Sequence, residues 1–177
     1  MVTKAWSKVG DLVTPAHGLG ATSVGQEFYV YGGQEAGGVS QRFQKCVTSI
    51  DQATGLSVSC SDITQGCPLE FGQWVSDVGL TARHGNSDFV FAHEKLQSVY
   101  VYGGSESGGD SASGAAVYKF DTVACSWSVA QDNLCRDASD TAPCVTYKGV
   151  AGALENGFFL HYSDPAPNEA NTVVYPL

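Results

Sequence analysis

FYVYGGQEAGG at residues 28–38 and VYVYGGSESGG at residues 99–109 are two copies of one pattern. Each copy begins with alternating aromatic and β-branched residues, and this period of two is typical of a β-strand. Each strand then reaches a pair of glycines. The pairs are Gly32-Gly33 and Gly103-Gly104. Because glycine adopts positive φ without a steric penalty, we expect the chain to turn at both pairs.

The repetition continues on both sides of these copies. A His-Gly turn precedes each one, within TPAHG (14–18) and within TARHG (81–85). Two further strand-like segments follow each copy. They are VTSID (47–51) and LSVS (56–59) in the first case, and VYKFD (117–121) and SWSV (126–129) in the second. Each unit therefore predicts four antiparallel strands in succession.

A third and weaker unit follows. Its strand GFFLHY (157–162) matches the aromatic strand of the other units but lacks the glycine pair. We align this unit on Gly149, which lies as far before Tyr162 as Gly18 lies before Tyr31. This unit also predicts antiparallel strands.

The third unit contains no segment that matches a fourth strand. TVVYPL (172–177) matches the third strand, whereas AWSKV (5–9) resembles the fourth strand SWSV (126–129) and aligns Trp6 with Trp127. We therefore expect three four-stranded units, the last of them split between the two terminal segments. The units span about 15–60, about 81–130, and about 147–177 together with 1–10.

The composition agrees with an all-β fold. The chain has 177 residues, which suggests a single domain over residues 1–177. It contains 21 glycines and only 15% charged residues, so it has many turns and a surface poor in Lys and Glu. No helical stripe of useful length is present.

Charge and hydropathy argue against two classes of partner. The formal net charge of −9 repels phosphate backbones, and we find no basic stripe, so we expect no nucleic-acid partner. No apolar run reaches the roughly 18 residues that a membrane helix requires. The segment MVTKAWSKVGDLV (1–13) lacks the apolar centre of a signal peptide. We therefore expect either that the protein is not secreted or that the sequence is a mature or excised segment.

Six cysteines in a loop-rich chain favour disulfides and an oxidising, extracellular compartment. The alternative is a set of reduced, buried thiols. Zinc is disfavoured, because the chain has no CxxC pair and no histidine at ligand spacing. Pairing neighbours across short loops predicts the bridges Cys60–Cys67, Cys135–Cys144 and, by remainder, Cys46–Cys125.

The glycine pairs, with a tryptophan further on, resemble the kelch repeat of β-propellers. The first unit has Leu56 in place of the tryptophan, and the second has Trp127. The resemblance implies radial four-stranded blades in which the glycine pairs and the tryptophans, Trp6 included, serve blade packing. It also implies a binding scaffold that closes by pairing strands from the two chain ends in one blade.

Three blades are fewer than the four to eight of closed propellers. Two apolar side faces would stay uncovered, so we expect assembly with another chain. One arrangement is a head-to-tail dimer in which each AWSKV (5–9) completes the last blade of its neighbour. The alternatives are a longer propeller, of which these residues are a part, and an open polymer.

Two loops offer candidate binding residues. Phe71 and Trp74 lie in FGQW (71–74), where an exposed aromatic ring would stack on a sugar or anchor a protein partner, or else cover the blade beneath. Glu106 and Asp110 lie in SESGGDSASG, which suits either an acidic metal-binding loop or a solvated one. No EF-hand spacing is present.

No enzyme motif stands out. His17 and His84 take equivalent places, which suits turn residues better than ligands or bases. His93, in HEKL, is expected at a solvated hairpin tip. Some kelch-like propellers are oxidases with a copper radical centre, but no matching motif is found. We expect no enzyme activity, no cofactor and no metal.

The sequence therefore supports three functional hypotheses. The first is a non-enzymatic binding or assembly module that associates with itself or with another protein, outside the cell. The second is a carbohydrate-binding propeller, motivated by Trp74. The third is an oxidase of the kelch type.

Overall fold

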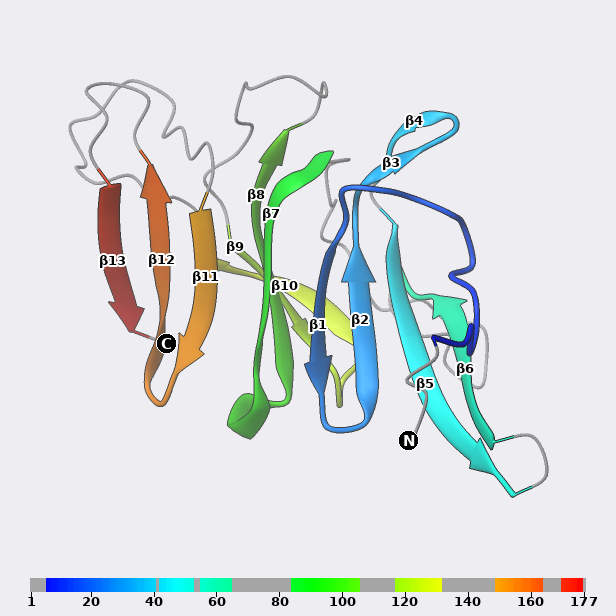
Figure 1. The fold of residues 1–177 in the computed structure, drawn as a ribbon. Coiled ribbons are helices and arrows are strands. Elements are labelled where there is room, and N and C mark those ends of the chain that lie inside the picture. The colour runs from blue at the N-terminus through cyan, green and yellow to red at the C-terminus, as the bar shows by residue number, and fades with distance from the viewer. Residues whose placement is uncertain are drawn as a thin grey trace, which may run out of the picture.

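The computed structural model describes residues 6–40, 42–52, 55–64, 84–105, 117–131, 149–163 and 170–176. These residues form three large antiparallel sheets, one for each unit expected from the sequence (Figure 1). The all-β class is therefore confirmed.

The first sheet has the strand order β1-β2-β5-β6. Its strands are β1 (Gly20–Val24), β2 (Glu27–Tyr31), β5 (Phe43–Asp51) and β6 (Gly55–Asp62). A small hairpin of β3 (Gln34–Glu35) and β4 (Gly38–Val39) follows β2.

The second sheet has the order β10-β9-β8-β7 and the third the order β11-β12-β13. The strands of the second are β7 (His84–His93), β8 (Ser98–Ser105), β9 (Val117–Asp121) and β10 (Ser126–Gln131), with the 3-10 helix η1 (Glu94–Leu96) between the first two. The strands of the third are β11 (Gly149–Leu154), β12 (Gly157–Ser163) and β13 (Ala170–Pro176).

The three sheets lie side by side, with β7 next to both β1 and β11 (Figure 1). The first strands of neighbouring sheets therefore lie next to each other. In the described part of the chain the sheets do not close into a ring, and the propeller implied by the resemblance is not confirmed.

Aromatic side chains fill the space between the first and second sheets. Phe43 of β5 lies 5.0 Å from the ring of Phe120 and 4.7 Å from that of Trp127. Tyr29 of β2 stacks on Phe43 at 5.6 Å. All four are buried, because alternation along each strand directs these positions to the same interface.

A second aromatic cluster joins the second and third sheets. Phe91 of β7 and Tyr100 of β8 stack at 5.1 Å, and Phe158 of β12 lies 5.4 Å from Phe91. These rings are buried as well. The second sheet therefore packs on both faces, whereas the first and third each pack through one of these interfaces.

The glycine pairs behave differently from each other. Gly32 and Gly33 have φ of 70° and 94° and turn the chain after β2, as expected. Gly103 and Gly104 instead continue β8, so the turn expected there is wrong. The reason is that the longer β7 supplies a pairing partner, since Asp88 lies opposite Gly103.

The split last unit is also wrong for a single copy. Residues 6–10 form no strand, and the third sheet has three strands among the described residues. The N-terminal segment instead lies on the first sheet, where the Val58 N–H donates to the Val9 carbonyl oxygen at 2.9 Å. Because the second sheet stands between the first and the third, this segment lies away from β13 (Figure 1).

Candidate functional site

Strand register shows which positions in the three sheets are equivalent. The first hairpin of each sheet ends in a directly opposed pair. These pairs are Val24–Glu27, His93–Ser98 and Leu154–Gly157. Counting from these ends makes Phe28, Val99 and Phe158 equivalent. Val99 faces the first sheet and Phe158 faces the second, so each such residue faces the preceding sheet.

The equivalence extends across the strands. In the second sheet Val99 lies opposite Phe120, which lies opposite Trp127. In the first sheet Phe28 lies opposite Cys46, which lies opposite Cys60. The first sheet thus has two cysteines where the second has two aromatic side chains.

Leu56 does not take the place of the tryptophan, as the sequence suggested. It lies opposite Ile50, near the hairpin end of β6, and its side chain is 51% exposed. The equivalent of Trp127 is Cys60, four residues further along the strand. Sequence similarity suggests Leu56 as the equivalent of Trp127, whereas the strand register shows that the equivalent residue is Cys60.

The outer face of the first sheet is the face turned away from the second sheet, formed by Ala21, Phe28, Val30, Cys46, Val58 and Cys60. It is the counterpart of the second-sheet face that packs on Tyr29 and Phe43. No sheet covers it in the described part of the chain. Phe28 is therefore 46% exposed, whereas its counterpart Val99 is fully buried.

A strap of residues 6–13 crosses this outer face. Besides the bond to Val9, the Val13 N–H donates to Gln44 Oε1 at 2.8 Å. Gly10 lies directly against β6, because a Cβ atom there would be 2.4 Å from the Val58 carbonyl oxygen. The strap is thus held on the sheet at a few points along its length.

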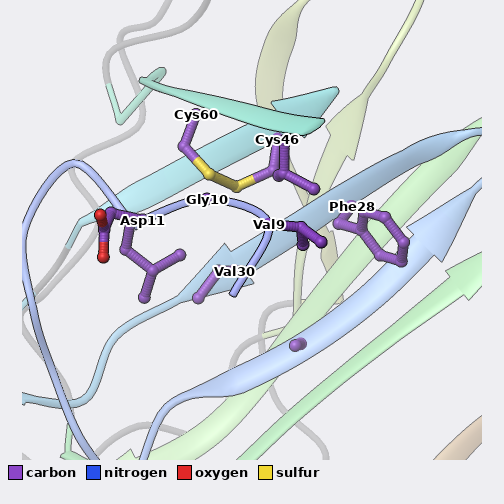
Figure 2. Close-up of a pocket in the computed structure, with 10 residues that line it drawn as sticks. Val9, Gly10, Asp11, Phe28, Val30, Cys46 and Cys60 are labelled. Carbon is purple, nitrogen blue, oxygen red and sulfur yellow. A yellow bond between two sulfur atoms is a disulfide. The ribbon is translucent and has the colours of Figure 1, made fainter. Parts of the chain in front are cut away.

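A partly open cavity of about 280 Å³ remains between strap and sheet. Figure 2 shows Val9, Phe28, Val30 and the sulfur bridge around it, with Asp11 at its margin. Protein interiors contain few voids larger than a water molecule. The strap therefore covers the apolar face loosely, unlike the close ring contacts between the sheets.

A disulfide joins Cys46 to Cys60, which lie directly opposite each other on β5 and β6. Both the Cys46–Cys125 and the Cys60–Cys67 bridges expected from the sequence are therefore wrong. Pairing by loop length ignored register, which brings the Cα atoms of Cys46 and Cys60 to 4.0 Å. Cys125 is disulfide-bonded too, and Cys135–Cys144 lies outside the described residues.

The lining of the cavity suits packing better than catalysis. Its ionisable side chain is Asp11, whose Oδ1 lies 2.7 Å from Lys8 Nζ in an ion pair that is about three-quarters exposed. An exposed ion pair of this kind contributes little to stability. The sulfurs of Cys46 and Cys60 are bonded to each other, so the cavity wall offers no thiolate nucleophile.

A network of charged side chains lies at the start of β5. The Arg42 guanidinium donates to Glu35 Oε1 at 2.9 Å and to Asp62 Oδ2 at 2.6 Å. Burial raises the pKa of Asp62, but hydrogen bonds from Thr64 and Arg42 outweigh it and hold this pKa below its ordinary value. Every charged member thus has a partner, which marks the network as structural.

The structure places none of the four binding residues expected from the sequence. Phe71, Trp74, Glu106 and Asp110 lie outside the described residues. The outer face was missed, although the alternation of Phe28 and Val30 along β2 marks a second apolar side of that strand. Such a two-sided strand is the available signal for a sheet that packs on both faces.

Two other expectations can be examined directly. Trp127 packs in the core, where it is 5% exposed, whereas Trp6 is fully exposed. His93 is 4% exposed, so the expectation of a solvated residue is wrong. Its Nδ1 accepts the Leu96 N–H at 3.3 Å, which caps η1 and keeps the ring inside the hairpin.

Among the described residues, no three His, Cys, Asp or Glu side chains are grouped to hold a metal ion. In the same part of the chain, no helix has the length and apolar character needed to cross a membrane.

Comparison with known proteins gives a likeness of fold only. No family model matches the chain, and no curated protein matches its sequence. Among solved structures, the one described as "Structure of YjhT" matches with a TM-score of 0.56 at 11% identity. The match covers 93% of this chain but 44% of that one, so this chain spans less than half the length of its structural neighbour.

Proposed function

We propose that this chain is a non-enzymatic assembly module whose three sheets act as kelch-like propeller blades and stack on those of a second copy. The observation that carries the proposal is the outer face of the first sheet. Its counterpart on the second sheet packs against Tyr29 and Phe43, but here a loose strap takes the place of a sheet. Apolar faces of this kind are typical of protein interfaces.

The third sheet offers the complementary face. Phe159 occupies the position of Tyr29 and Tyr100, each of which packs on the following sheet. Its ring lies over Gly152, and Val174 beside it is 60% exposed. Stacking this face on the outer face of a second copy would repeat the packing found twice within the chain, in head-to-tail order.

Two further observations agree with this proposal. YjhT is more than twice as long as the part matched here, so two copies of this chain would correspond to most of such a protein. The Cys46–Cys60 disulfide is compatible with an oxidising, extracellular location.

The test is the mass of the oxidised chain in solution, measured by light scattering over a dilution series. We expect a species of at least twice 18.6 kDa that dissociates on dilution. A mass of 18.6 kDa at all concentrations would refute the proposal.

A further inference from the structure

Among the described residues, no fourth strand lies beyond β13 at the outer edge of the third sheet, and we call this the empty position. β6 and β10 form the fourth strand of the first and second sheets, whereas β13 has β12 as its partner among the described strands. A strand edge of this kind presents unpaired N–H and C=O groups that another chain can bind.

Residues 6–9 match the empty position in sequence. Trp6 aligns with Trp127 at the start of β10. Trp127 is 5% exposed and packs on Phe43 at 4.7 Å, whereas Trp6 is fully exposed. A tryptophan buries roughly 150–250 Å² when it packs. In a single copy Trp6 buries none of this area, although the equivalent Trp127 packs in the core.

We infer that residues 6–9 of one copy form the fourth strand of the third sheet in a second copy. Trp6 would then follow Phe158 and Tyr175 across that sheet, as Trp127 follows Val99 and Phe120 across the second. This inference rests on the proposed self-assembly and names the strand that each copy exchanges.

The geometry of the stack allows this exchange. Phe43 of β5 packs on Trp127 of β10, so the third strand of one sheet lies beside the fourth strand of the next. In a docked pair, β13 of the second copy would therefore lie near β6, where Val9 is bound, and the empty position would adjoin β13. Packed sheets are about 10 Å apart, and an extended chain spans about 3.3 Å per residue. Residues 9–13 can therefore bridge the two sheets while Val13 stays bound to Gln44.

Leaving the first sheet costs the strap few contacts. Release of residues 6–9 breaks the Val58–Val9 backbone hydrogen bond, and the ion pair of Lys8 with Asp11 is largely exposed. Exposed ion pairs contribute little to stability. In return, the exchanged segment gains a ladder of backbone hydrogen bonds and the burial of Trp6.

One variant on each side of the junction tests the inference. Trp6→Ala impairs the donated strand, and Val174→Pro impairs the accepting edge. Cys46, the counterpart of Tyr175, is only 4.0 Å from Cys60 between Cα atoms, which marks a non-hydrogen-bonded pair. The amide of the adjacent Val174 therefore points to the free edge, where proline removes a donor without breaking the β12–β13 ladder.

We expect each variant alone to raise the dissociation constant of the assembly about 30-fold or more, since a buried tryptophan is a typical hot spot. A one-to-one mixture should recover a dimer, because it retains one intact junction. Val129→Pro, at an exposed valine on the outer strand of the second sheet, is the matched control and should assemble like the wild type.

Trp6 fluorescence gives an independent measurement, taken as the difference between the wild type and Trp6→Phe. We expect this emission to shift to shorter wavelength as the chain is concentrated. An assembling wild type whose two variants assemble equally well, or whose Trp6 emission does not shift, would overturn the exchange while leaving self-assembly intact. A wild type that stays monomeric would instead refute the proposed function itself.

Discussion

Gly33 lies where the backbone after β2 passes close to the His17 segment. Its φ is 94°, and a Cβ atom there would be 2.8 Å from the His17 carbonyl oxygen. The His17 and Gln34 backbones also exchange hydrogen bonds of 3.1 and 2.8 Å. The glycine is therefore required both by its conformation and by the close approach.

We expect Gly33→Ala to lower the free energy of unfolding by about 1–3 kcal/mol, because it adds strain at positive φ and a backbone clash. Gly37→Ala is the matched control. Gly37 is exposed, and a Cβ atom there would meet no other atom within 4 Å, so its effect should be within about 0.5 kcal/mol. Urea unfolding of both variants measures the difference, and equal midpoints would contradict the argument.

Single residues also show where the sequence alone fails. Leu56 was matched to Trp127 because both are large and apolar, yet register gives that place to Cys60. His93 was expected in solvent because its neighbours in HEKL are polar, yet its ring caps η1 from inside the hairpin. In both cases the position of the side chain depends on how the strands pair, and the residue type alone does not determine this pairing.

At the scale of strands, the sequence is far more informative. Alternation and turn residues predicted β9 at 117–121 without error, and β12 to within one residue. The third unit, however, was aligned one residue out of step. Its hairpin end places His161, not Tyr162, at the position of Tyr31. Glycine spacing cannot detect such a shift, because the glycine used for the alignment precedes β1 in the first unit.

The Cys46–Cys60 bridge connects β5 to the edge strand β6, on which the strap lies. Its loop of 14 residues corresponds to about 3 kcal/mol of chain entropy in the unfolded state. We expect replacement of both cysteines by alanine to lower the free energy of unfolding by about 2–4 kcal/mol, measured in guanidinium chloride.

The matched control is Val47→Ala with Ser59→Ala, the next directly opposed pair on the same two strands. Both residues are exposed, so we expect a loss below about 1 kcal/mol. If the two double variants unfolded at the same concentration of denaturant, the disulfide would contribute nothing beyond ordinary strand pairing.

At the scale of the whole molecule, the same packing of one sheet on the next occurs twice, between the first and second sheets and between the second and third. Tyr29 packs toward the second sheet and Tyr100 toward the third. Phe159 and Phe28 lie on the two faces that no sheet covers among the described residues. If the proposed self-assembly continues this packing, its contacts are head-to-tail and give a closed ring or a filament according to the rotation between copies.

The outer face is tested most directly at Phe28, which is 46% exposed and lies on the row that includes the disulfide. A glutamate there would place a charge between two apolar faces, and we expect self-association to weaken about 30-fold or more. Val123→Glu adds the same charge at an 81% exposed turn position away from both faces.

Both proteins would be followed by sedimentation velocity at matched concentrations, with circular dichroism to verify folding. Ala21→Glu provides a second position on the same face; Ala21 also lines the strap cavity but is already exposed. We expect Phe28→Glu and Ala21→Glu to sediment as monomers under conditions where Val123→Glu remains assembled. If all three remained assembled, the chain would associate through another surface, and the register argument that singles out the outer face would fail.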